Sequence, residues 1–183
     1  MSPLFNTQMN VAKMNLLYKS APLHDIGKVA VPDNILLKKG KLTTTEFEMM
    51  KKHTIFGGEA LKGTEETLRK NSFLQVAYEI AYYHHEKWNG MGNPKGLKKE
   101  NIPLSARIMA IADVYDALTS KRRYKPPFSH IHAVSIIQKD SGLHFDPKIV
   151  DIFMLVNEKF RKIASDFADT EEERRIVELN EVI

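Results

Sequence analysis

Apolar residues in this chain recur with the period of an α-helix, and no segment alternates as a half-buried strand does over a useful length. The range 103–118 is the clearest helix. Others are expected at 5–20, 129–139, from Asp146-Pro147 through Phe160, and at 171–183. There is no long apolar run, so no transmembrane segment is expected. The sequence therefore predicts an all-α fold.

Two more helices are expected in the middle of the chain, separated just before Thr64. Thr44 or Thr45 can cap the first, which contains His53, and Gly57-Gly58 would loosen its middle. The second is expected from Thr64 to Tyr83. The glycine- and asparagine-rich range 88–99 is expected to be a loop.

Several side chains of the types that commonly bind metals, histidine and aspartate, lie in or next to these expected helices. They are His24, Asp25, His53, His84, His85 and Asp113. A helical bundle can gather such residues around one pocket, and a carboxylate such as Asp25 can bridge two cations, which a lone imidazole cannot do. For His53 alone a surface or capping role is the commoner outcome. The two pairs together with Asp113 favour a metal site. His130, His132 and His144 lack such context and are expected to be structural or exposed.

The chain has no cysteine, so disulfides and thiolate metal sites are excluded and any metal must be held by nitrogen and oxygen. No secretion signal is visible, and we expect a cytoplasmic protein. The net charge of +4 does not by itself indicate binding to DNA. Basic residues are concentrated between Glu86 and Lys125, which suits an anionic phosphate ligand, although a solvated lysine-rich loop explains part of that excess equally well.

The spacing of these motifs resembles the HD-GYP domain, a branch of the HD phosphohydrolases. The resemblance rests on His24-Asp25 with Gly27-Lys28, on His84-His85-Glu86, and on Gly90, Gly92-x-Pro94 and Asp113, and it extends from about residue 18 to 167. It implies an HD-domain-like helical bundle with a binuclear metal site in its core. The domain would occupy 1–168, with a truncated or diverged first helix, and 169–183 would be a C-terminal amphipathic helix.

The same resemblance implies a metal-dependent phosphodiesterase that hydrolyses cyclic di-GMP to linear pGpG, with further cleavage to GMP left open. Two divalent ions, iron or manganese, would be bound by the six candidate ligands. Catalytic roles are implied for Asp25, Lys28 and Asp116, although a salt bridge between Lys28 and Asp116 is an alternative. Substrate contacts are implied for Arg122, Lys125, Lys28 and Asn93.

Two departures from the family pattern support a second interpretation beside the phosphodiesterase. Asn89 and Asn93 stand where the family has Asp and Tyr, and no histidine precedes His24, so a third metal is not expected. The alternative is a degenerate module that binds cyclic di-GMP or a protein partner with little or no hydrolysis. An upstream receiver or sensor domain is typical of this family, and a homodimer is left open.

Overall fold

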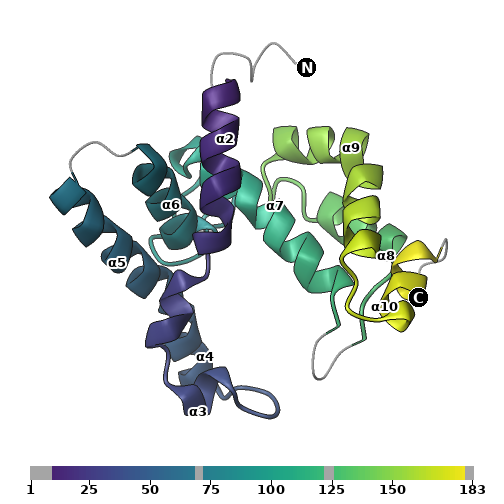
Figure 1. Cartoon of the computed structure of the whole chain (residues 1–183), viewed down its shortest axis with the longest axis horizontal. Helices are drawn as coiled ribbons and strands as arrows, with labels where there is room; N and C mark the ends of the chain where they lie inside the picture. The colour runs from purple at the N-terminus through teal and green to yellow at the C-terminus, as the bar shows by residue number, and fades with distance from the viewer. Residues whose placement is uncertain (1–9, 69–71, 122–125, 180–183) are drawn as a thin grey trace.

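The computed structural model describes residues 10–68, 72–121 and 126–179. Every regular element in these ranges is a helix, and their only β-type pairing is an isolated bridge between Ser141 and Phe145 (Figure 1). The predicted all-α fold is confirmed. None of the helices in this part of the chain is long and apolar enough to cross a membrane.

The first half of the molecule contains seven of these helical elements. They are α2 (Val11–Ser20), η1 (Ala21–Leu23), η2 (Ile26–Ala30), α3 (Asp33–Leu36), α4 (Thr44–Lys51), α5 (His53–Leu68) and α6 (Ser72–Tyr83). In Figure 1, α5 and α6 lie side by side, and α2 packs on α6. The core of this half is formed by the buried side chains of Leu61, Leu74, Ala77 and Ala81.

Three expectations for this half were wrong. Residues 64–68 continue α5, and the next helix begins only at Ser72. The cap of α4 is Thr43, which forms a capping box with Glu46, so neither Thr44 nor Thr45 has that role. Gly58 does not loosen its helix: a Cβ there would collide with the ring of Tyr82, so the glycine lets α6 pack against α5.

The second half contains η3 (Lys99–Asn101), α7 (Leu104–Thr119), α8 (His130–Lys139), α9 (Pro147–Asp166) and α10 (Glu171–Glu178). Ser129 and Asp146 cap α8 and α9 through their side chains. The core between α7, α8 and α9 includes Ile111, Tyr115 and Phe153. Helix α10 packs on α9 and α8 with Val177 buried, and the domain boundary at residue 168 stays a prediction.

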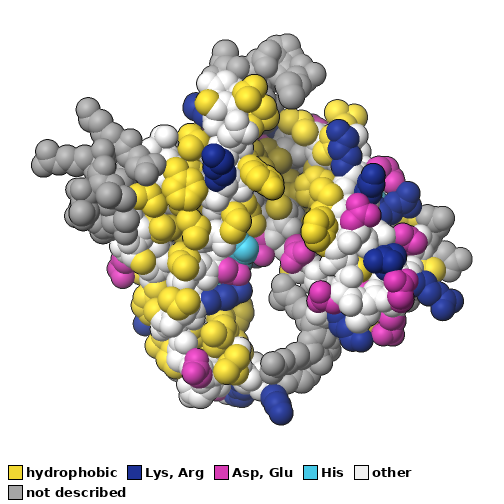
Figure 2. Space-filling view, viewed as in Figure 1, with side chains coloured by type: hydrophobic (Ala, Val, Ile, Leu, Met, Phe, Trp, Pro, Cys, Tyr) yellow, Lys and Arg dark blue, Asp and Glu magenta, His cyan; other side chains and the backbone are white. Residues whose placement is uncertain are grey.

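Helix α7 runs between the two halves in Figure 1 and packs against α6 on one side and against α8 and α9 on the other. Figure 2 shows that the surface is hollowed between the halves, with histidine and acidic side chains visible at the bottom of the hollow. Of the predicted metal ligands in the first half, His24 lies near Asp113 on α7.

Candidate metal centre

The His24-Asp25 pair lies in the turn between η1 and η2. Gly27, two residues after Asp25, is buried at the point where η2 meets the beginning of α5. A Cβ at Gly27 would collide with the carbonyl oxygen of His53 and the amide nitrogen of Gly57. Because only glycine allows this backbone contact, the turn can bring Asp25 next to His53.

Three of the histidines are oriented by the backbone of their own turn. The Nδ1 atoms of His24, His53 and His84 lie 2.9, 2.7 and 3.0 Å from backbone carbonyl oxygens three or four residues earlier in the chain. A carbonyl oxygen only accepts, so each Nδ1 carries a proton and donates it. The Nε2 atom of each ring is thereby left to face the centre, which is the usual arrangement of metal-bound histidine.

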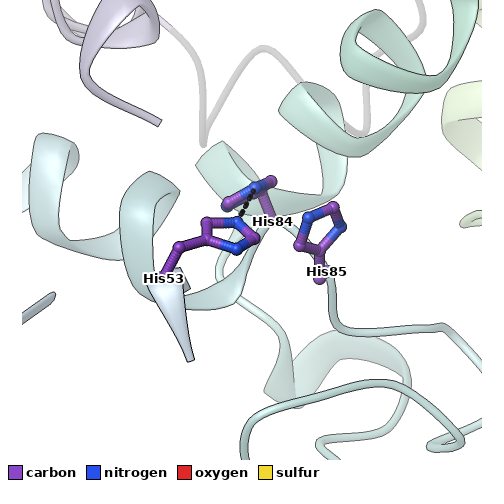
Figure 3. A group of neighbouring side chains, drawn as sticks. All are labelled: His53, His84 and His85. Atoms are coloured by element: carbon purple, nitrogen blue, oxygen red, sulfur yellow. Dashed lines mark hydrogen bonds between the residues drawn. The ribbon is translucent and has the colours of Figure 1, made fainter. Parts of the chain in front are cut away.

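The Nε2 atoms of His53 and His84 lie 3.5 Å apart, and His85 completes a group whose ligand atoms are all within 4.8 Å of one another (Figure 3). Burial, followed by the nearby His53 and His24 rings, lowers the pKa of His84 to about 4. Burial also lowers the pKa values of His53 and His85. The rings are therefore neutral at pH 7, and a cation between the facing lone pairs would remove their repulsion.

The Asp25 carboxylate lies between two groups of nitrogen atoms. Its Oδ1 is 3.4 Å from Nε2 of His53 and 4.0 Å from Nε2 of His84, whereas its Oδ2 is 3.2 Å from Nε2 of His24. Asp113, on α7, places Oδ1 3.8 Å from the same His24 nitrogen. Two clusters of nitrogen and oxygen donors thus share Asp25, and this donor set fits two divalent cations with a bridging carboxylate.

Hydrogen bonds within the His-Asp turn also set its charge state. Burial alone would raise the pKa of Asp25, but the hydrogen bonds from His24 and Lys28 hold it well below its usual range. Burial opposes protonation of His24, yet the hydrogen bond and the charge of Asp25 raise its pKa. A cation bound at Nε2 of His24 would displace the proton that this nitrogen donates to Asp25.

Lys28 and Asp116 are not paired with each other. The Nζ atom of Lys28 donates to Oδ2 of Asp25 over 2.5 Å. Asp116 is exposed and accepts a hydrogen bond from Ser120. The structure therefore places Lys28 at the centre, whereas no hydrogen bond or ion pair among the described residues joins Asp116 to it. The catalytic role of Asp116 stays a prediction.

The predicted substrate-binding residues are only partly placed. The backbone N–H of Asn93 donates to the carbonyl oxygen of His85 over 3.1 Å, and the Oδ1 of Asn93 is buried without a hydrogen-bond partner in the described part of the chain. The side chain of Asn89, which stands where the family has Asp, accepts a hydrogen bond from the amide of Met91 and so helps to order the loop. Arg122 and Lys125 lie outside the described residues.

Two features near the centre were not found from the sequence. The Glu86 side chain is buried and accepts hydrogen bonds from the amides of Lys95 and Leu97. Its place directly after the histidine doublet was the only signal. The second is the ion pair between Arg107 and Asp146 beside Trp88.

His130, expected to be structural or exposed, is structural: it is buried and forms hydrogen bonds with Tyr115 and Asn157.

Residues 6–149 match the family model described as "HD domain". The chain is 56% identical over 167 residues to a "Cyclic di-GMP phosphodiesterase" of Vibrio cholerae, covering 91% of this chain and 34% of that protein. It is 43% identical over 164 residues to a protein of the same name from Thermotoga maritima, covering 89% of this chain and 41% of the relative. A "3'3'-cGAMP-specific phosphodiesterase 2" of Vibrio cholerae is 42% identical over 158 residues, covering 86% of this chain and 29% of the relative.

The chain thus spans about a third of the length of the curated relatives it matches. A crystal structure of a cyclic GMP-AMP specific phosphodiesterase of V. cholerae superposes with a TM-score of 0.55 at 20% identity. That match covers 96% of this chain and 45% of the other. At this identity the likeness is one of fold.

Proposed function

Because this chain belongs to the HD domain family, we propose that it is a metal-dependent phosphodiesterase that hydrolyses cyclic di-GMP to linear pGpG, with a second cut to GMP left open. The observation that carries the proposal is the Asp25 carboxylate between the Nε2 atoms of His24 on one side and of His53 and His84 on the other. Such a donor set suits hydrolysis of a phosphodiester between two cations.

We infer that two divalent ions are held by His24, Asp25, His53, His84, His85 and Asp113. Once bound, these ions supply a Lewis acid that activates water and withdraws charge from the phosphate. Iron and manganese are the proposed metals because both accept mixed imidazole and carboxylate ligands. Asp25 would contribute a ligand to both metal ions, since one of its oxygens faces each group of ligands.

The remaining candidate residues would act on the substrate. Lys28, already at the Asp25 carboxylate, would place an ammonium beside the scissile phosphate. Arg122 would offer a guanidinium fork and Lys125 a point charge to the phosphate oxygens. Asp116 is proposed to hold a proton at its carboxylate during turnover. The buried, unpaired Oδ1 of Asn93 supports a substrate contact there, because a donor on the ligand would satisfy it.

The names of the relatives support a cyclic dinucleotide as the substrate class, and they include both cyclic di-GMP and 3'3'-cGAMP phosphodiesterases. We favour cyclic di-GMP because the relatives with the higher identities, 56% and 54%, are named "Cyclic di-GMP phosphodiesterase" and "Probable cyclic di-GMP phosphodiesterase". A cytoplasmic location, an upstream receiver or sensor domain, and a homodimer are further parts of this proposal.

The proposal is tested on protein purified without oxygen and loaded with iron or manganese. We expect two metal ions per chain by elemental analysis, and release of pGpG from cyclic di-GMP, faster than from 3'3'-cGAMP, by chromatography. Two ions without turnover, but with binding of cyclic di-GMP by calorimetry, would favour the degenerate module instead. A chain that takes up no metal would overturn both the metal centre and the activity.

A further inference from the structure

Glu86 directly follows the two histidine ligands and is almost completely removed from solvent, with 2% of its surface exposed. Its two carboxylate oxygens accept hydrogen bonds from the backbone amides of Lys95 at 2.6 Å and Leu97 at 3.0 Å. A buried carboxylate needs such donors, because an unpaired one is costly in a protein interior. No ion pair to Glu86 is present among the described residues. Its charge therefore rests on the loop that contains Lys95 and Leu97.

That loop is also joined to the histidine doublet by its backbone. The amide of Asn93 donates to the carbonyl oxygen of His85 over 3.1 Å. Gly92 lies so close to the preceding turn that a Cβ there would collide with the backbone of Glu86 and Lys87. The segment from residue 93 to 97 is thus folded back against the residues that present the metal ligands.

The beginning of the same loop, at Trp88 and Asn89, is held by different contacts. The amides of Trp88 and Asn89 each donate over 2.9 Å to the carbonyl oxygens of His144 and Leu143, in the connection between α8 and α9. Losing the Glu86 carboxylate would leave those contacts in place. Among the described residues, the hydrogen bonds that hold residues 93–97 against the preceding turn are those from Lys95 and Leu97 to Glu86 and from the Asn93 amide to His85. The Lys95 ammonium also lies 5.9 Å from the centre of the Tyr82 ring.

From these contacts we propose that Glu86 is a positioning residue, which fixes the segment 93–97 beside the metal ligands and thereby sets substrate affinity while leaving metal binding unchanged. This inference rests on the proposed function, since the affinity in question is that for cyclic di-GMP. The residues that Glu86 positions are Asn93, whose buried Oδ1 lacks a partner, and Lys95, whose side chain is exposed.

Glu86→Gln tests the proposal because it keeps the size of the side chain but turns one acceptor into a donor that faces an N–H group. Glu79→Gln is the matched control. Glu79 lies on α6 and accepts two hydrogen bonds, from the hydroxyl of Ser105 at 2.6 Å and from the side-chain amide of Gln75 at 3.1 Å. A hydroxyl and a side-chain amide can each also accept, so both partners can pair with the amide of a glutamine, which the fixed backbone N–H groups at Glu86 cannot do. For Glu86→Gln we expect KM to rise about 10- to 100-fold, the scale of one hydrogen bond to a charged group. The metal content should stay at two ions, and Glu79→Gln should match the wild type.

Amide hydrogen exchange supplies a reading that does not depend on activity. The amides of Lys95 and Leu97 should exchange faster in Glu86→Gln than in the wild type, while those of Trp88 and Asn89 should not change. Should Glu86→Gln fail to fold, Glu86→Asp carries the same readings, because it keeps the charge but withdraws the carboxylate by one methylene.

The possible outcomes separate this inference from the proposed function. An active wild type with an unchanged KM in Glu86→Gln would make Glu86 purely structural and overturn the inference alone. Loss of metal from Glu86→Gln would also overturn it, since the residue would then act on the ligands. A wild type that neither binds nor cleaves cyclic di-GMP would overturn the proposed function, and this inference with it.

Discussion

At the scale of single residues, the centre depends on Asp25. Its carboxylate faces imidazoles from its own turn, from the beginning of α5 and from the end of α6. The histidines are each held by a backbone carbonyl oxygen and would keep their orientation without it. Asp25 is therefore the group whose loss should separate the two donor clusters without disturbing the helices.

We predict that Asp25→Ala loses most of the bound metal and all phosphodiesterase activity. The helices should persist, because their stability rests chiefly on packing of apolar faces. Elemental analysis and circular dichroism on the same samples provide the measurement. Asp151→Ala, which removes an exposed carboxylate from α9, should keep both metal and activity. An Asp25→Ala protein that still carries two ions would contradict the bridging role.

Asn93 offers a second prediction at this scale. The backbone of Asn93 is bonded to His85, so a side chain at this position starts beside the metal ligands. Asn93→Tyr should raise the affinity for cyclic di-GMP, because a ring and a hydroxyl replace a short amide with an unpaired oxygen. Calorimetry and steady-state kinetics measure the change. Identical kinetics would mean that the asparagine is a neutral replacement.

At the scale of elements, the contact between η2 and α5 determines whether the ligands meet. It is a contact of backbone with backbone, made by Gly27 on η2 and by the residues from His53 to Gly57 on α5. The room available for a side chain differs between Gly27 and Gly57. A Cβ at Gly57 would have its nearest neighbours at 3.2 to 3.4 Å, which a small shift can relieve, whereas a Cβ at Gly27 would overlap backbone atoms.

Gly27→Ala should therefore push η2 away from α5 and separate Asp25 from His53. We predict that it loses metal and activity and lowers the free energy of unfolding by about 1–3 kcal/mol, as overpacking does. Gly57→Ala, on the other side of the same contact, should lose less than half as much. Urea unfolding and metal analysis test the pair. Equal behaviour of the two variants would show that the close approach at Gly27 is not what holds the ligands together.

At the scale of the whole molecule, a buried ion pair joins α7 to the beginning of α9, and its arginine also contacts Trp88 in the loop after α6. The Arg107 guanidinium on α7 lies 2.6 Å from Asp146, the cap of α9, and stands over the ring of Trp88. The side chains of Arg107 and Asp146 are 11% and 1% exposed. Removing the arginine would leave a buried carboxylate with only its capping hydrogen bond.

Arg107→Met should lower the free energy of unfolding by about 3–5 kcal/mol, the cost of breaking a buried ion pair from one side. Arg161→Met, which breaks the exposed pair with Glu158, should cost at most about 1 kcal/mol. Urea unfolding measures both, and fluorescence of Trp88, the only tryptophan, reports directly on the junction. A similar decrease in the free energy of unfolding in both variants would show that the buried ion pair does not stabilise the protein more than an exposed one.

The all-α class and most helix positions were predictable, because helical periodicity is a property of residues close in the sequence. The candidate ligands were named from their motifs; the structure brings His24, Asp25, His53, His84 and Asp113 close together, and their binding of metal stays a prediction. The end of α5 was not predictable, since residues 64–68 are as compatible with starting a helix as with ending one. The roles of Glu86 and Arg107 could not be predicted either. They depend on contacts with backbone amides and with a cap that only the folded chain brings close.

The hydrogen bonds from Nδ1 to the carbonyl oxygens of Ala21, Met50 and Ile80 have a consequence for the order of folding and metal binding. Each donor ring is oriented as soon as its own turn forms, so the chain can complete folding before it acquires a cation. Metal binding need not then precede folding, and protein prepared without metal should already have the helical content of the metal-loaded protein.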